Sequence, residues 1–179
     1  MNKLAKWVKR TEEGEQGFTL IELMVVVLII GILVAIAVPT FLGARRGAQN
    51  RAAESSVRNA LTSAKVYFTN KDGYANLNPS SMTALEPSLI WATAVSATNA
   101  NQVDVAVMTN TTSSSLDGVC VSAQSASGNI YAMYDDPTIG TLYYGGTATS
   151  GDPCSGIAAA PAAKVGGWGN EASTAGIAW

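Results

Sequence analysis

A long apolar run with one charged residue inside it constrains this chain more than any other feature. Nearly every residue from Phe18 to Val38 is apolar. A helix of about 20 such residues is long enough to cross the hydrocarbon core of a bilayer. Glu22 lies near the start of the run, where a carboxylate is disfavoured by about 2.5–3.5 kcal/mol on insertion scales. The run predicts a membrane-spanning helix, and Glu22 needs a functional reason to be there.

The residues on either side of the run bear on its orientation. The preceding basic residues are typical of a targeting segment and favour a cytoplasmic N-terminus. Arginines after the run weaken that rule. Cys120 and Cys154 would be expected to pair in an exported domain, so they argue independently that the C-terminal part lies outside the cytoplasm. The basic residues before the run are Lys3, Lys6, Lys9 and Arg10, and those after it are Arg45, Arg46, Arg51 and Arg58.

Composition excludes several classes of function. The 179 residues suit one domain with an appendage. Eleven basic residues against 13 acidic ones leave no electrostatic footprint for nucleic acid. The sequence contains no histidine, which removes Ser-His-Asp and Cys-His catalysis and most zinc sites. We therefore expect a protein that is not an enzyme and that holds no cofactor and no metal.

The helix is predicted to continue well beyond the bilayer, over residues 18–70. Its second half is amphipathic, so it should stand outside the membrane and bury its apolar face. The residues Asn70-Lys71-Asp72-Gly73 end it. Pro39, with Gly31 and Gly43 nearby, weakens its middle and predicts either a kink or a segment that can straighten. The apolar positions at helical spacing are Ala53, Val57, Ala60, Leu61, Ala64 and Phe68.

The C-terminal part alternates short apolar runs with turn-forming clusters. The stretch with Pro79 and Pro87 is interpreted as a loop. The runs after it predict an antiparallel meander of three or four strands with one face on the amphipathic half of the helix, an α+β fold. Residues 145–179 show no pattern of regular structure. The expected strands are 103–107, 118–121, 130–134 and 141–144.

Two short motifs could suggest a calcium site and a glycosylation site, but neither motif is strong evidence. Asp135-Asp136-Pro137 could suggest calcium, but adjacent carboxylates point in different directions and supply too few ligands. We expect a proline-containing turn there. Asn110-Thr111-Thr112 fits the glycosylation pattern, which is weak evidence beside the default of a solvated loop.

The residues around Glu22 resemble a known signature. Gly17 followed by Phe-Thr-Leu-Ile-Glu, opening a long apolar helix after a short basic leader, resembles the prepilin signature of type IV pilins. The resemblance extends to about Tyr74. It implies that a prepilin peptidase cuts after Gly17 and that the new amine of Phe18 is N-methylated. It also implies that Glu22 pairs with the Phe18 amine of a neighbouring subunit, since a paired buried charge is tolerated and specifies register.

The same resemblance implies an organisation and a role. A leader, residues 1–17, would be removed; the helix, 18–70, would span the membrane to about residue 40; and residues 71–179 would form an extracytoplasmic globular domain. Cys120 and Cys154 would close a C-terminal disulfide loop. The protein would polymerise with copies of itself into a pilus serving adhesion, motility or DNA uptake. Its other partners would be the prepilin peptidase, the inner-membrane assembly machinery and, before assembly, lipid.

Three alternatives stay open on the sequence. A pseudopilin of a type II secretion system shares the N-terminal signature, although many major pseudopilins bind calcium and lack a disulfide. Ala35-Ile36-Ala37 resembles a signal-peptidase site, which would release a secreted binding module starting at Val38. An uncut, membrane-anchored surface protein is the third.

Overall fold

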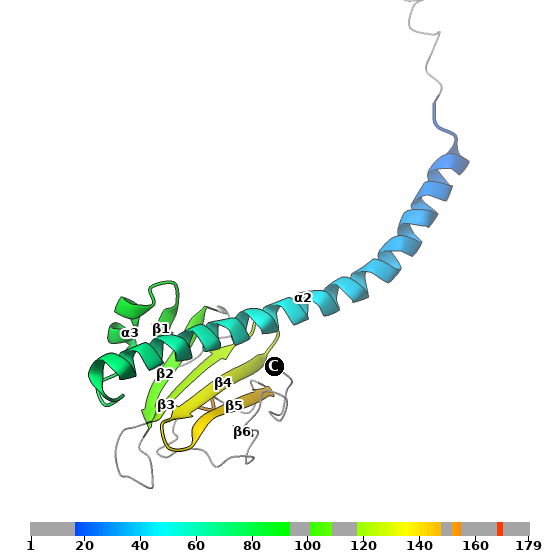
Figure 1. Ribbon diagram of the computed structural model, residues 1–179. Helices are drawn as coiled ribbons and strands as arrows, with labels where there is room; N and C mark the ends of the chain where they lie inside the picture. Colours follow the sequence, from blue (N-terminus) through cyan, green and yellow to red (C-terminus); the bar gives the residue numbers. More distant parts are fainter. Residues whose placement is uncertain (1–16, 94–100, 109–117, 148–151, 155–167, 170–179) are drawn as a thin grey trace, which may run out of the picture. The chain divides into compact units, whose positions relative to one another are not determined.

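A computed structural model describes residues 17–93, 101–108, 118–147, 152–154 and 168–169. The chain divides into two compact units, residues 1–43 and 44–179, and helix α2 (Leu20–Lys71, 52 residues) contributes to both. Figure 1 shows the elements along the chain. The predicted long helix over residues 18–70 is therefore confirmed, and it runs through Pro39 without interruption.

The C-terminal end of α2 follows the predicted stop. Asp72 has a φ of 55° and Gly73 a φ of 155°. Glycine adopts such positive φ values at no steric cost, and aspartate is one of the few other residues that tolerates the left-handed region. These two residues turn the chain away from the helix axis.

In the first unit, the apolar side chains of α2 are exposed on every side. Phe18 is 90% exposed, and the large apolar residues from Leu20 to Leu42 are at least 48% exposed. The helix contains a window of mean hydropathy 3.1 that is 0% buried, and it is long and apolar enough to cross a membrane. Such a surface is stable in lipid or against other apolar helices, and not in water.

In the second unit, α2 buries a stripe of mostly small residues on one face of the sheet (Figure 1). Tyr67 is buried where the sequence pattern predicted Phe68, which is only partly buried and packs beside it. The rest of the stripe is as expected from helical spacing, and consists of Ala53, Val57, Ala60, Leu61 and Ala64.

A short helix follows where a loop was expected. Helix α3 (Pro79–Leu85) begins with a capping box in which Asn78 accepts from the Ser81 N–H, and the Ser81 side chain accepts from the Asn78 N–H. Proline at the first helical position fits, because its missing N–H is not needed there. Met82 of α3 is fully buried in the core beneath α2.

The sheet has six strands in the order β1-β2-β3-β4-β5-β6. The predicted meander corresponds to β2–β5, which pair antiparallel in sequence order. The prediction of a purely antiparallel sheet of three or four strands was wrong in two respects: β1 pairs parallel to β2, and β6 adds a short antiparallel edge beyond residue 145. The strands are β1 (Ile90–Ala92), β2 (Gln102–Met108), β3 (Gly118–Gln124), β4 (Asn129–Asp136), β5 (Gly140–Thr147) and β6 (Trp168–Gly169).

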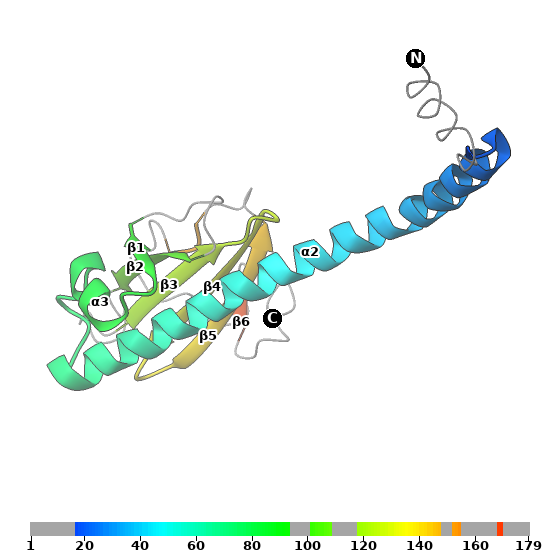
Figure 2. The ribbon, with the colours of Figure 1, turned by 90° about the horizontal axis from the view of Figure 1, so that it is seen from above.

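Each face of the sheet carries its own apolar cluster. The face towards α2 presents Val121, Tyr131 and Met133, which pack against the helix stripe (Figure 2). The opposite face presents Cys120, Tyr134 and other side chains that point away from α2. Alternation along β3 and β4 assigns consecutive residues to opposite clusters, which explains why these strands are buried along almost their whole length.

Gly118 provides a test of this packing. A Cβ at this position would lie 2.1 Å from Tyr134 Oη and 2.7 Å from two ring carbons. We expect Gly118→Ala to lower the free energy of unfolding by about 1–3 kcal/mol, as overpacking of a close-packed core does. The matched control is Gly47→Ala in α2, where a Cβ meets nothing within 4 Å. It should leave stability unchanged or slightly higher, because alanine is the better helix former. Denaturant unfolding of both variants in detergent micelles measures the difference, and equal stabilities would contradict this packing.

Candidate functional site

Helix α2 begins with a closed set of hydrogen bonds between Thr19 and Glu22. The Thr19 carbonyl accepts the first helical bond, from Leu23 N–H at 3.3 Å. The Glu22 N–H donates to Thr19 Oγ1 at 3.2 Å. Glu22 Oε2 in turn accepts from the Thr19 N–H at 2.9 Å and from the Thr19 hydroxyl at 2.7 Å. This is a capping box, with threonine at the N-cap and glutamate three residues later.

The capping box gives Glu22 a role that sequence reasoning missed. Thr-x-x-Glu at the start of an apolar helix is a sequence signature of this arrangement. The carboxylate satisfies the Thr19 N–H, which apolar surroundings could not satisfy. Its bonds to Thr19 use Oε2 and leave its other oxygen, Oε1, out of the box. The box also depends on no residue before Thr19.

The sequence singled out Pro39, Gly31 and Gly43 as points of weakness in the helix. All three lie within α2, and a Cβ at either glycine would meet nothing within 4 Å. Next to Pro39, the Thr40 hydroxyl donates to the carbonyls of Ile36 and Ala37 at 3.3 and 2.9 Å. These bonds occupy carbonyls near the point where proline cannot donate. Flexibility at these positions stays a prediction.

A polar cluster ties α2 to the sheet within the second unit. Lys65 Nζ lies 2.9 Å from Asp135 Oδ1, which also accepts from the Thr141 hydroxyl at 2.6 Å. Tyr74 donates its hydroxyl to Asp135 Oδ2 at 3.3 Å. Burial, followed by the charge of Asp135, raises the pKa of Tyr74 well above its usual range. The phenol therefore keeps its proton and remains a donor to the carboxylate.

The neighbouring Asp136 serves the other face of the sheet. It accepts from the Tyr134 hydroxyl at 3.1 Å and from the Thr138 N–H at 2.7 Å. Residues 137–139 form the turn between β4 and β5, so the predicted proline-containing turn is confirmed. Asp135 and Asp136 thus point in different directions, each with its own partners. Within the described ranges, no group of three His, Cys, Asp or Glu side chains is arranged to hold a metal ion.

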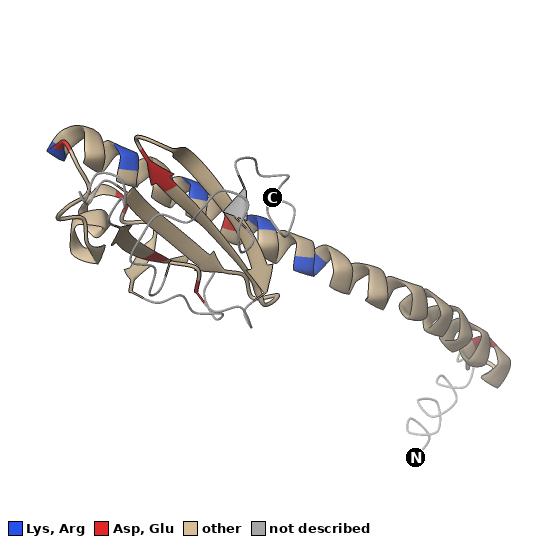
Figure 3. Cartoon of the chain, turned by 90° about the horizontal axis from the view of Figure 1, so that it is seen from below, with Lys and Arg blue, Asp and Glu red and all other residues tan. Residues whose placement is uncertain are grey.

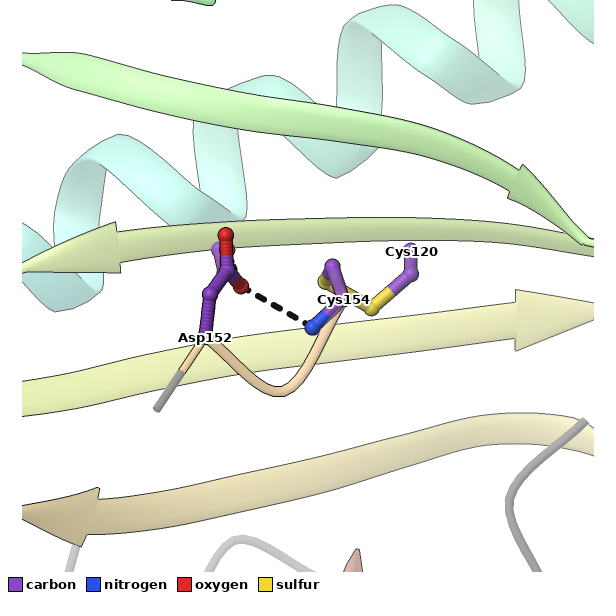
Figure 4. The surroundings of a disulfide bond; sticks show 4 residues. Cys120, Asp152 and Cys154 are labelled. Carbon is purple, nitrogen blue, oxygen red and sulfur yellow. Dashed lines mark hydrogen bonds between the residues drawn. A yellow bond between two sulfur atoms is a disulfide. The ribbon is translucent and has the colours of Figure 1, made fainter. Parts of the chain in front are cut away.

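Cys120 and Cys154 form a disulfide on the sheet face away from α2 (Figure 4). Cys120 lies on β3, and the two Cα atoms are 5.5 Å apart. Asp152 sits beside the bond and accepts from the Cys154 N–H at 2.9 Å and from the Ser122 hydroxyl at 2.7 Å through the same oxygen, Oδ1. The expected pairing is confirmed, and Asp152 is a second attachment of the same loop that the sequence did not reveal.

The charges of α2 are divided between its two halves (Figure 3). Glu22 is the charged residue between Phe18 and Leu42, and Arg45 begins the charged part of the helix. Buried Glu54 lies near Arg51 and Arg58. Burial raises the pKa of its carboxyl group, and the two arginines oppose that rise. The first half therefore offers a nearly uncharged surface with one carboxylate at its start.

Comparison with known proteins also singles out the start of α2. Residues 14–38 match the family model described as the prokaryotic N-terminal methylation motif. The type IV major pilin protein PilA of Myxococcus xanthus is 42% identical over 69 residues, which are 38% of this chain and 31% of that protein. The N-terminal part of the chain thus carries the methylation motif of prokaryotic pilins and is similar to a type IV major pilin. The type IV wide pilus major component PilA4 of Thermus thermophilus is 28% identical over 136 residues, 76% of this chain and 84% of that protein.

The match to the Myxococcus protein is confined to part of each chain. The stretch shared with the Myxococcus protein spans about a third of that relative's length. No solved structure matches this chain significantly. Two predictions made from sequence fall largely outside the residues that the structure describes: the leader over residues 1–17, of which only Gly17 is described, and the glycosylation pattern at Asn110.

The disulfide generates a stability prediction. Replacing both cysteines, as Cys120→Ala with Cys154→Ala, should lower the free energy of unfolding by about 2–5 kcal/mol, the usual cost of removing a native disulfide from a small secreted domain. Thermal unfolding in detergent measures it. Chemical reduction of the unmodified protein is the control and should shift the midpoint in the same direction. A double variant as stable as the parent would show that the bond contributes nothing.

Proposed function

We propose that this chain is the structural subunit of a type IV pilus filament, cut after Gly17, N-methylated on Phe18 and polymerised through the first half of α2. The observation that carries the proposal is the methylation motif at residues 14–38, which opens a helix with apolar side chains exposed on every side. Lipid can cover that surface before assembly. Helices of other copies can cover it afterwards, through a heterologous interface that does not close and so forms a filament.

The geometry at the proposed cleavage site supports processing. Gly17 and Phe18 are both exposed and precede the first residue of α2. The capping box joins Thr19 to Glu22, so it lies wholly in the chain that cleavage would leave. Removing the leader therefore keeps the start of the helix satisfied and creates a positive amine on Phe18.

Glu22 can serve its own helix and a neighbouring subunit together. Oε2 holds Thr19, and Oε1 can accept the Phe18 amine of another copy. An amine and a carboxylate that meet in an apolar filament core compensate each other, whereas a misregistered subunit would leave both charges unpaired. Glu22 would then set the axial register of each new subunit.

The implied partners and location follow from this role. Before assembly the pilin would be a single-pass protein of the cytoplasmic membrane with its N-terminus inside, and afterwards it would be part of a surface pilus. It would meet the prepilin peptidase and methylase, the inner-membrane assembly machinery and copies of itself. Adhesion, motility and DNA uptake are the uses that such a filament would serve.

A pseudopilin of a type II secretion system is the second candidate. The disulfide between Cys120 and Cys154 favours a pilus subunit, because many major pseudopilins lack one. A secreted module cut after Ala37 is less consistent with the structure. Ala35 and Ala37 lie inside the continuous helix α2, and that cut would discard Glu22 with its capping box.

Mass spectrometry of the pilin purified from its native cell tests processing. We expect a chain that starts at Phe18, heavier by one methyl group and lighter by two hydrogens for the disulfide. Fragmentation of the N-terminus should place the methyl group on the Phe18 amine. A chain that starts at Val38 would overturn the proposal in favour of a secreted module, and one that starts at Met1 would point to an uncut membrane anchor.

A pair of variants separates docking from capping. Glu22→Gln keeps a carbonyl oxygen for Thr19 but removes the charge, so it should insert and be processed yet yield less than about a tenth of the parent's filaments. Thr19→Ala removes the capping hydroxyl but keeps the carboxylate. It should cost about 0.5–2 kcal/mol of helix stability and still assemble. Electron microscopy with quantification of sheared pili measures both. Normal filament assembly by the Glu22→Gln variant would contradict the proposed docking role of the Glu22 carboxylate.

A further inference from the structure

A buried and a half-buried carboxyl group, those of Asp104 and Asp152, lie together on the side of the sheet away from α2. Asp104 lies in the middle of β2 and is 2% exposed. Asp152, next to the disulfide, is close enough for a hydrogen bond between the two carboxyl groups. In the described part of the chain, Asp104 Oδ1 and Asp152 Oδ2 are buried oxygens without a donor. Unpaired buried charges of the same sign are too costly to coexist without a compensating group.

The donors around the pair are distributed unevenly. Asp152 accepts two hydrogen bonds, from the Ser122 hydroxyl and the Cys154 N–H, both through Oδ1. Both bonds end on the same oxygen and leave Asp152 Oδ2 without a donor among the described residues. Asp104 is the more deeply buried of the two, and the backbone N–H of Val105 is the donor that reaches it. When environments separate two neighbouring carboxyl groups in this way, one holds the proton and the other stays charged.

We propose that Asp104 and Asp152 share a single proton, and that the resulting O–H···O bond is a pH-dependent clasp that holds the loop Asp152–Cys154 on the sheet. Asp104 donates through Oδ1 to Asp152 Oδ2, which gives both orphaned oxygens a partner. The clasp closes when the pair carries one proton and opens when that proton is lost. The clasp does not depend on whether the chain forms filaments.

The titration of Asp104 agrees with this geometry. Burial, followed by the charge and the hydrogen bond of Asp152, raises the pKa of Asp104 from 3.8 to about 7, while the Val105 N–H opposes the shift. The folded state thus binds a proton between about pH 4 and 7 that the unfolded chain has already lost. Stability from this group is present at low pH and is lost as the pH rises through about 7.

Other groups around Asp104 leave Asp152 as its titrating neighbour among the described residues. The positions paired with Asp104 are Ser122 on β3 and Ala92 on β1, and neither is charged. On the same face, Asp136 is occupied by the Tyr134 hydroxyl and the turn after β4. The proton that controls the clasp is therefore the one between Asp104 and Asp152.

The test uses the full-length pilin in detergent micelles, unfolded thermally at a series of pH values from 5 to 8.5. We expect the midpoint of the unmodified pilin to fall by about 4 °C or more across this range. Asp104→Asn carries a permanent N–H donor in place of the shared proton, so its midpoint should fall by less than half as much. The matched control is Asp72→Asn in the exposed turn after α2, which should follow the unmodified pilin.

A second readout follows the clasp itself. The N–H of Cys154 donates to Asp152, so its exchange with solvent, corrected for the intrinsic effect of pH, should accelerate about tenfold above pH 7 in the unmodified pilin and stay unchanged in Asp104→Asn. If Asp104→Asn fails to fold, Asp152→Asn tests the same pair from the other side and should also flatten the profile. Equal pH slopes in the parent and the folded variants would overturn the proposal. A parent whose midpoint at pH 8 rises by several degrees with millimolar calcium would also overturn it, in favour of a cation between the carboxylates.

Discussion

The contact between the second half of α2 and the sheet is the constraint on which the globular unit depends. Ala53, Ala60 and Ala64 are fully buried, and their small side chains let the helix backbone lie close to the strands. Larger side chains of the sheet, such as Tyr131 and Met133, fill the space that this leaves. Dispersion and burial at a close-packed interface of this kind supply most of a domain's stability. An ion pair between Lys65 and Asp135 also joins the helix to β4.

Much of this architecture could be predicted from periodicity. The long helix and the four central strands carry patterns that repeat every 3.6 or 2 residues, so their existence was predicted even where their ends were off by a few residues. The elements that were missed are short. Strands β1 and β6 have three and two residues, too few to show alternation, and their pairing depends on neighbours distant in sequence. Helix α3 was obscured because Pro79 was interpreted as a breaker, although proline also begins helices.

The functional residues divide in the same way. Gly17, Phe18 and Glu22 form a local motif and are visible in the sequence. Within that motif, the bonds of Glu22 to Thr19 could have been found from the spacing alone. The association of Asp104 with Asp152 could not, because it joins a strand to a loop 48 positions later through tertiary contacts. Composition could even mislead here, since isolated aspartates in a Ser- and Thr-rich domain are usually solvated.

Strand β3 carries two anchors for one short loop, and this has a mechanical consequence. Cys120 holds Cys154 covalently, and Ser122, two residues along the same strand, holds Asp152 through a hydrogen bond. Because the two attachments lie close together on one strand, a force that pulls on the loop is divided between them. If the hydrogen bond between Ser122 and Asp152 breaks, the disulfide still holds the loop at the sheet. The hydrogen bond can then form again. In a filament of the proposed kind, this arrangement would keep the loop Asp152–Cys154 on the sheet under load.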